Sequence, residues 1–184
     1  MTTNLKNPRL RVNGESVFLR YVTIDDFEEM SVLYRESRRF YQGYIDPPED
    51  REKFAAYVAR NESETSECLV ICRTQDAKIV GVINLSQIFR RGFQNAYLGY
   101  YLGVKYTGMG FMTEAVRLIL RFAFRDLKLH RIEANVQPEN VPSIKVLRRC
   151  GFTREGFSRK YLKVRGRWRD HERFAIIRED WKGK

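Results

Sequence analysis

The chain has 184 residues, of which 43% are apolar and 31% charged, and it carries a formal net charge of +11. At roughly 150 residues per domain this length predicts a single domain, and the composition excludes a disordered chain. No apolar run approaches the roughly 18 residues of a membrane span, and the N-terminal segment lacks the apolar stretch of a secretory signal.

The predicted elements alternate between strands rich in aromatic and β-branched residues and helices with apolar faces. In chain order we expect a strand at residues 16–22, helices at 23–38 and 49–61, strands at 68–73, 79–89 and 96–104, a helix at 111–126, a strand at 131–137, a helix at 140–149 and a closing hairpin at 152–177. This order predicts an α+β (mixed α/β) fold, with helices packed against one central sheet.

One domain is expected from about residue 14 to residue 178, with residues 1–13 and 179–184 as short terminal extensions. No stretch rich in Gly, Ser or Pro could serve as a linker inside it. The three cysteines, Cys68, Cys72 and Cys150, have no metal-type spacing. Free thiols of this kind are typical of a reducing cytoplasm, where we expect the protein.

Two glycines mark the strand expected at residues 96–104. Gly99 and Gly103 predict a bulge, or the close approach of another backbone or of a ligand. The helix at residues 111–126 carries arginines at four-residue intervals, which places them on one exposed stripe and leaves its apolar residues for the core.

The segment 105–110, KYTGMG, joins that strand to that helix. Gly108 and Gly110 permit positive φ and close backbone approach, and the first N–H groups of a helix are unpaired. The loop is therefore a candidate pyrophosphate site, although a plain left-handed turn explains the same two glycines. The sequence contains neither a P-loop pattern nor the G-x-G-x-x-G of a dinucleotide-binding fold.

A second polar group lies where the strand at residues 131–137 gives way to the next helix. Asn135, Asn140 and Ser143 bring two amides and a hydroxyl to this junction. Asn140 is also an ordinary N-cap, and Pro142 suits a first helical turn. Both a ligand channel and a simple helix start explain this pattern.

Two segments together resemble one family. The segment 99–115, GYYLGVKYTGMGFMTEA, is similar to the acetyl-coenzyme A loop of the GNAT superfamily of N-acetyltransferases. The segment 130–156, HRIEANVQPENVPSIKVLRRCGFTREG, is similar to the strand, helix and strand that follow it. The order of elements also resembles that fold, a mostly antiparallel sheet splayed in the middle and flanked by about four helices. The closing GRWRDH most resembles the RimJ/RimL-like branch of ribosomal-protein N-acetyltransferases.

Carried over residue by residue, the resemblance implies an acetyl-CoA site and no metal. The backbone of Leu102, Gly103 and Val104 would contact the pantetheine arm, whose channel Asn135 and Asn140 would contact or shape. Lys105 stands where the family has Arg or Gln. It keeps a positive charge, but on a compact ammonium group instead of the forked guanidinium of Arg. The pyrophosphate would be held by the N–H groups of Thr107, Gly108, Met109, Gly110, Phe111 and Met112.

The resemblance further implies direct attack of a primary amine on the acetyl thioester, without a covalent enzyme intermediate. Ser143 occupies the position of the proposed acid in RimL-like enzymes. An N–H near Leu102 or Gly103 is the candidate oxyanion donor. The base is a departure from the pattern, because the hairpin segment 159–163, RKYLK, has no acid where that branch has Glu.

Asp170 is the favoured substitute for this base, ahead of Glu133 and an ordered water chain, although its basic neighbours also make it a salt-bridge partner. The histidines His130 and His171 are less favoured, and His171 points to the opposite face of its strand from Asp170. An N-terminal α-amine, with a pKa of about 7.7–8.0, needs less help from a base than a lysine amine near 10.4.

Three functions follow from these observations. The leading one is an acetyl-CoA-dependent N-acetyltransferase acting on a protein N-terminus, with a ribosomal protein as candidate acceptor. A second keeps the fold and takes a small amine, such as an antibiotic, a polyamine or an amino acid. A third, of another class, is a non-catalytic ribosome- or RNA-binding module, which the intact glycine loop opposes and the missing hairpin Glu favours.

The positive charge is concentrated near the C-terminus. Residues 145–169 hold ten basic side chains and a single acid, Glu155. One cofactor does not need so many charges, so we expect an exposed basic surface suited to rRNA contact, the alternative being a general contribution to solubility. The sequence indicates no membrane partner and leaves the oligomeric state open.

Overall fold

The structure is a computed structural model that describes residues 10–41 and 43–183. The strands are β1 (Arg11–Asn13), β2 (Val17–Tyr21), β3 (Ser66–Arg73), β4 (Ile79–Phe89), β5 (Asn95–Leu102), β6 (Arg131–Val136), β7 (Thr153–Val164) and β8 (Arg167–Ile177). The α-helices are α1 (Phe27–Ser37), α2 (Arg51–Ala59), α3 (Phe111–Arg121) and α4 (Val141–Arg149).

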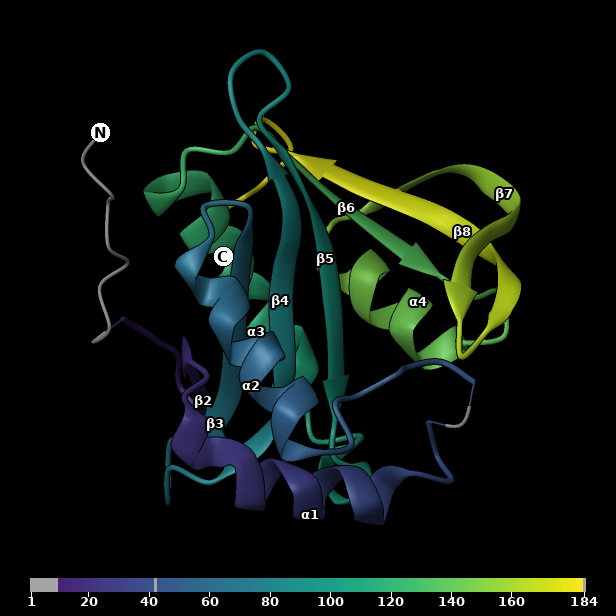
Figure 1. The fold of residues 1–184 in the computed structure, drawn as a ribbon. Coiled ribbons are helices and arrows are strands. Elements are labelled where there is room, and N and C mark those ends of the chain that lie inside the picture. The colour runs from purple at the N-terminus through teal and green to yellow at the C-terminus, as the bar shows by residue number, and fades with distance from the viewer. Residues whose placement is uncertain (1–9, 42, 184) are drawn as a thin grey trace.

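The strands form one sheet in the order β1-β2-β3-β4-β5-β6-β8-β7. Neighbouring strands are antiparallel except β5 and β6, which run parallel. The parallel pairing joins only residues 95–97 to residues 131–133. Beyond it the two strands separate, and β6, β8 and β7 lean away from β5 (Figure 1). The predicted mixed fold, with a mostly antiparallel sheet splayed in the middle and four flanking helices, is confirmed.

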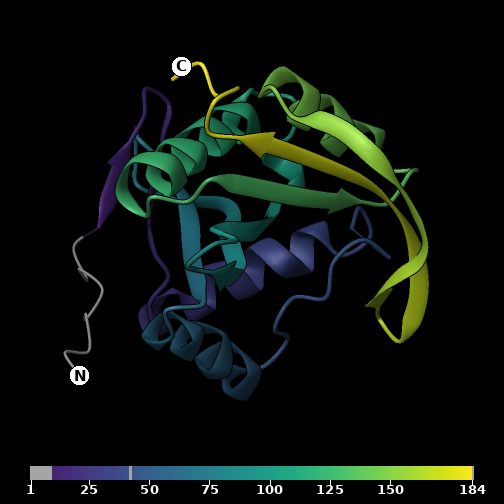
Figure 2. The ribbon, with the colours of Figure 1, turned by 90° about the horizontal axis from the view of Figure 1, so that it is seen from above.

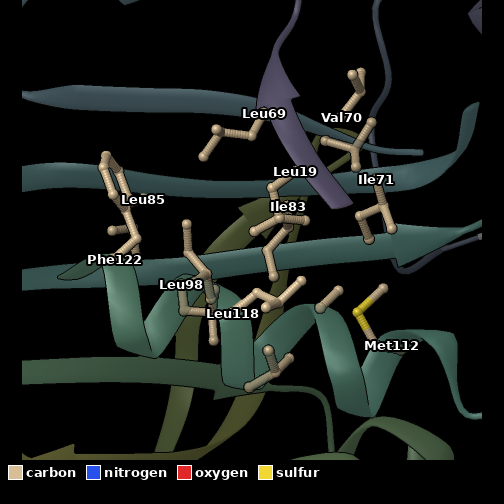
Figure 3. Close-up of a cluster of buried hydrophobic side chains, with 14 of the residues drawn as sticks. Leu19, Leu69, Val70, Ile71, Ile83, Leu85, Leu98, Met112, Leu118 and Phe122 are labelled. Carbon is tan, nitrogen blue, oxygen red and sulfur yellow. The ribbon is translucent and has the colours of Figure 1, made fainter. Parts of the chain in front are cut away.

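The helices cover both faces of the sheet. Seen from above, α3 and α4 lie on one face, and α1 and α2 lie on the other (Figure 2). The apolar side of α3 packs against the sheet, where Met112, Leu118 and the following Phe122 meet strand residues such as Leu85 and Leu98 (Figure 3). This packing holds the N-terminus of α3 beside the end of β5, and so it positions the glycine-bearing loop.

The long helix ends differently from the sequence-based expectation. The α-helix stops at Arg121 and continues as one π-helical turn, Phe122–Asp126, in which the Leu127 N–H donates to the Phe122 carbonyl at 3.0 Å. Phe122, Ala123 and Phe124 of this turn are all buried, as are Leu118, Ile119 and Leu120 of the α-helix before it.

Two strand boundaries also differ. β1 was not predicted, because a strand of three residues that buries only Val12 is too short for alternation to be recognised. It pairs with residues 18–20 of β2. β5 ends at Leu102 instead of residue 104, and Gly103 begins a 3-10 turn, Val104–Tyr106. The bulge expected at the glycines of β5 is absent, since residues 98–102 pair regularly with β4. Gly103 instead permits close approach, since a Cβ there would lie 3.1 Å from the Leu33 side chain.

Candidate active site

The glycine-bearing loop between β5 and α3 presents backbone amides to the outside. Gly108 and Gly110 have φ values of +79° and +82°, and a Cβ at either would find nothing within 4 Å. No residue in the described part of the chain accepts a hydrogen bond from the N–H groups of residues 108–112. The left-handed turn therefore leaves free amides at a helix N-terminus, an arrangement that favours negative charge.

Two groups predicted for this loop are engaged elsewhere. The Thr107 N–H donates to the Val104 carbonyl at 3.2 Å, so it leaves the predicted set of phosphate-binding amides. The Lys105 ammonium pairs with Glu36 of α1 at 3.0 Å, and this hydrogen bond raises the pKa of Lys105. Both are engaged because the tight turn after β5 directs them back onto the protein.

The splayed end of β5 offers one amide to the gap between the strands. The Gly103 N–H donates to the Val80 carbonyl of β4 at 2.8 Å, and the Val104 N–H donates to the buried Ser37 hydroxyl at 3.0 Å. The Leu102 N–H donates at 3.2 Å to the hydroxyl of Tyr41. Because Tyr41 lines the gap and Ser37 does not, Leu102 is the residue of the three whose amide a ligand in the gap could take over.

Two adjoining cavities occupy the gap. One, of about 480 Å³, extends from Gly108 to the first turn of α4, and the other, of about 160 Å³, lies between β5, β6 and β8. They share Tyr100, Asn140 and Ser143 in their walls. The structure therefore brings the glycine loop and the polar junction after β6 to one cleft, although 25 residues or more separate them in the chain.

Ser143 and Tyr100 form a hydroxyl pair in this shared wall. Their side-chain oxygens lie 2.9 Å apart, and burial raises the pKa of Tyr100. Each hydroxyl can both donate and accept, so the pair can pass a proton. Sequence reasoning missed Tyr100, although strand alternation places it on one face of β5 with Leu98 and Leu102.

The two asparagines differ in their roles. The Asn140 side-chain oxygen accepts from the Ser143 N–H at 3.3 Å, so this residue caps α4 while also lining both cavities. The Asn135 side-chain oxygen is buried in the smaller cavity and has no partner among the described residues. A buried acceptor of this kind fits a water or a ligand N–H.

Asp170 does not face the cleft. Its carboxylate is exposed and accepts from the Lys160 N–H at 2.7 Å, across an irregular stretch of β7 where Lys160 has a φ of +46°. Glu133, the other acid considered, binds the Arg131 guanidinium at 2.8 Å. In this arrangement the carboxylate holds the backbone of the hairpin, and the choice of Asp170 as base stays a prediction.

His171 faces the cleft from β8, and Glu139 lines the larger of its two cavities. His171 is 4% exposed and lines the smaller cavity with Asn135, Tyr100 and Ser143. Its Nδ1 lies 3.0 Å from the Arg169 carbonyl, and burial lowers its pKa. His130 instead lies at the surface, where it pairs with Glu179 at 3.0 Å. Strand alternation correctly predicts that His171 and Asp170 lie on opposite faces of β8. It does not predict which of the two faces meets the cleft.

A third cavity, of about 740 Å³, opens on the other side of β5. The segment between α1 and α2 walls it together with α2 and Arg165 at the tip of the β7–β8 hairpin. Arg165 holds this wall through the Ile45 carbonyl at 3.1 Å and the Glu49 carboxylate at 3.4 Å. Tyr100 and Tyr101 line this cavity as well as the 480 Å³ cavity, so an acceptor could approach the glycine loop's occupant from here.

The described part of the chain holds no group of three or more His, Cys, Asp or Glu side chains placed to bind a metal ion. Within residues 10–41 and 43–183, no helix combines the length and apolar character needed to cross a bilayer.

Comparisons with known proteins agree on one family. The acetyltransferase (GNAT) domain matches residues 16–153, which is more than half of the chain. The probable N-acetyltransferase YjcK of Bacillus subtilis is 37% identical over 177 residues, covering 92% of this chain and 98% of that protein. The ribosomal protein uS5 alanine N-acetyltransferase of Escherichia coli is 31% identical over 183 residues, covering 95% and 94%.

Solved structures and a more distant relative extend this picture. Mycobacterium smegmatis RimJ in complex with CoA-disulfide superimposes with a TM-score of 0.81 at 30% identity, covering 89% of this chain and 82% of that one. The spermidine N(1)-acetyltransferase of Escherichia coli is 26% identical over 171 residues, covering 92% of this chain and 90% of that protein. The similar proteins thus share one fold and differ in the amine that their names give.

Proposed function

The chain belongs to the GNAT family of acetyltransferases, and we propose that its acceptor is the α-amino group of a protein N-terminus, with a ribosomal protein as the candidate. Acetyl transfer from acetyl-CoA to an amine is the activity of the family. The observation that carries the choice of acceptor is the charge of the 740 Å³ cavity, whose carboxylates are already paired.

The residues of the glycine loop fit acetyl-CoA. The free amides of residues 108–112 at the start of α3 suit the pyrophosphate, and the 480 Å³ cavity beside them has room for an extended arm. Acetyl-CoA supplies an activated acetyl thioester there. Asn135 and Asn140 would border this arm, and Lys105 would contribute its charge without leaving Glu36.

Leu102 is our candidate for stabilising charge on the thioester oxygen. Its N–H lies at the splayed end of β5 and is held by Tyr41, a side chain that can rotate away. Donors aimed at a developing oxyanion are usually the largest single contribution to this type of reaction. Ser143, backed by Tyr100, would deliver a proton to the departing sulfur.

The charge of the acceptor cavity favours a peptide N-terminus over a polyamine. Its lining includes three basic residues, Lys53, Arg60 and Arg165, and two acids, Asp46 and Glu49. Arg165 occupies both acids, at 3.8 Å from Asp46 and 3.4 Å from Glu49. A polyamine carries several ammonium groups and needs free carboxylates, whereas a peptide N-terminus brings a single amine and a polar backbone.

Two alternatives are weaker on these observations. A small-amine acceptor is favoured by the spermidine acetyltransferase among the relatives, but it finds no surplus of acids in this cavity. A non-catalytic ribosome-binding module is favoured only by the hairpin, which lacks the expected Glu. The free loop amides and the Ser143–Tyr100 pair are what a working acetyltransferase requires.

The ribosome contact is proposed for the basic surface formed by residues 145–169. Nearly all of its ten basic side chains are exposed. Within it, Arg154 pairs with Glu172, while Arg159, Lys160 and Lys163 of β7 have no carboxylate partner among the described residues. Unpaired cations on one exposed strand suit the phosphate backbone of rRNA.

The acceptor is tested by offering three amines with acetyl-CoA and following acetylation by mass spectrometry. The first is a lysine-free peptide that begins with Ala, the second is the same peptide blocked at its α-amine and carrying one Lys, and the third is spermidine. We expect the free N-terminus to be acetylated fastest. Faster acetylation of spermidine would transfer the proposal to the small-amine alternative, and acetylation of none would contradict both.

A further inference from the structure

We propose that His171, through its Nε2 atom, is the group that accepts the proton from the acceptor amine. This role rests on the proposed function only in requiring an amine acceptor. It fills the place of the base that the hairpin segment 159–163 lacks.

The strand pairing sets the position of His171. In chain order, Glu172 is the first residue of β8 that pairs with β6, and its partner Val136 is the last residue of β6. His171 precedes Glu172, so it lies beyond the end of β6, where the cleft begins. The side chain is buried at 4% exposure in the 160 Å³ cavity whose wall includes Ser143 and Asn135. This cavity shares Ile45, Gly99 and Tyr100 with the 740 Å³ cavity proposed for the acceptor, so an amine that enters there comes next to the cavity that His171 lines.

The hydrogen bonding of the ring fixes which nitrogen is free. A carbonyl oxygen can only accept, so the contact of 3.0 Å between Nδ1 and the Arg169 carbonyl places the proton of the neutral ring on Nδ1. Nε2 is left with its lone pair, and no described residue donates to it. This is the arrangement of a general base whose other nitrogen is held by the backbone.

The surroundings keep the ring neutral at pH 7. Burial, the largest influence, lowers the pKa of His171, while the Arg169 carbonyl and the carboxylates of Asp170 and Glu139 oppose this shift. The other polar residues that line its cavity or contact its ring are uncharged: Tyr41, Tyr44, Tyr100, Asn135, Gln137, Asn140, Ser143 and Tyr161. The neutral ring can accept a proton, and it loses this ability as the pH falls through its pKa.

The buried oxygen of Asn135 supports the same route. It lines the cavity with His171 and has no partner among the described residues. A cavity of about 160 Å³ has room for ordered water, which needs only about 10–15 Å³ of such space. A water or an ammonium N–H that donates to Asn135 can donate to Nε2 as well, so direct and water-mediated transfer are both served.

The protons of the reaction balance with this assignment. The ammonium gives one proton to Nε2, and the nitrogen lone pair then bonds to the thioester carbonyl carbon. The C–S bond breaks, and the sulfur takes the second proton of the nitrogen through Ser143 and Tyr100. The imidazolium of His171 finally returns its proton to solvent, so no other reactant is required.

The test compares His171→Gln and His171→Ala with the matched control His130→Gln, which changes a histidine outside the cleft. At pH 7 we expect His171→Gln to lower kcat/KM about 10²-fold, a typical contribution of a general base. The deficit should narrow as the pH rises above about 8, where an α-amine is neutral without help. Imidazole should restore part of the activity of His171→Ala, and His130→Gln should match the wild type.

A second measurement needs no turnover. ¹⁵N NMR of the free wild-type protein should show the His171 ring neutral at pH 7, with its proton on Nδ1. A proton on Nε2 would overturn the proposal, as would a loss of activity that is equal at every pH and is not rescued by imidazole. A pH-dependent loss in Asp170→Asn would return the role to that carboxylate. If the wild-type protein acetylates no amine, the proposed function is contradicted. The NMR measurement of the His171 ring does not depend on that outcome, so the two failures can be told apart.

Discussion

At the scale of single residues, the glycine-bearing loop depends on two backbone conformations. Gly108 and Gly110 lie at φ values of +79° and +82°, where other residues pay roughly 1–2 kcal/mol. Space around both is open, so a Cβ would meet no other atom. A substitution therefore acts through backbone strain and through the effect of its side chain on a bound anion, and these two effects can be separated.

Gly108→Glu is expected to abolish the thermal stabilisation that CoA gives, because its carboxylate would lie among the amides proposed to bind the pyrophosphate. Gly166→Glu is the matched control, since Gly166 also has a positive φ, +77°, with open space around it, and lies in the β7–β8 turn. Both variants should lose similar stability in a thermal melt without ligand. An unchanged CoA-induced shift in Gly108→Glu would refute the loop assignment.

The hydroxyl pair offers a second test at this scale. If Ser143 and Tyr100 pass one proton together, Ser143→Ala and Tyr100→Phe should each lower kcat by about 10- to 100-fold. The double variant should then be no slower than the slower single variant, because groups that act as a unit are not additive. Steady-state kinetics of the four proteins measures this, and effects that multiply would show that the two hydroxyls work separately.

The residue scale also shows where sequence reasoning reaches its limit. Alternation along β8 correctly separates Asp170 from His171, but the cleft face is set by the pairing of β8 with β6 and by the point where β6 ends. That pairing joins residues about 40 apart in the chain, which a local pattern does not reveal. Tyr41 and Tyr100 were missed for the same reason, since the hydroxyl of each has its hydrogen-bond partner on a residue far away in the chain.

At the scale of elements, local signals predicted what local physics determines. The helix at α3 was expected because its apolar spacing is regular, and the start of α4 because Asn140 and Pro142 suit a first turn. The π-helical turn and β1 were missed, since no local pattern marks a change of helical hydrogen bonding and β1 depends on pairing with β2. The splay between β5 and β6 was expected only from the family resemblance, because no local pattern encodes the loss of a pairing.

The capping of α4 links an element to the chemistry. Asn140→Ala removes the side-chain acceptor of the Ser143 N–H, which should cost about 1 kcal/mol and lower Tm by roughly 2–4 °C. Because the cap also holds the turn that carries Ser143, kcat should fall as well. Asn140→Ser keeps a capping oxygen and is the control. Equal Tm values for the two variants in thermal melts would show that the cap contributes nothing.

At the scale of the whole molecule, the charge and the cleft occupy related positions. The splay moves β6, β8 and β7 away from β5, and β7 then forms the outer edge of the sheet. The exposed cations Arg159, Lys160 and Lys163 lie on this edge strand, and Arg165 at its end borders the 740 Å³ cavity proposed for the acceptor. A large anionic partner bound to β7 would therefore lie beside the entrance for the amine.

Reversing three of these charges tests that arrangement. The triple variant of Arg159, Lys160 and Lys163 to Glu should co-sediment weakly with ribosomes and show a smaller dependence of binding on salt, because fewer counterions are released. Its kcat/KM for a short peptide should stay near the wild-type value, since none of the three lines a cavity described above. The control reverses Arg90, Arg91 and Lys128, which are exposed near the opposite end of β5 and change the net charge equally. Equal loss of ribosome binding in both triples would mean that net charge, and not the β7 edge, attracts the partner.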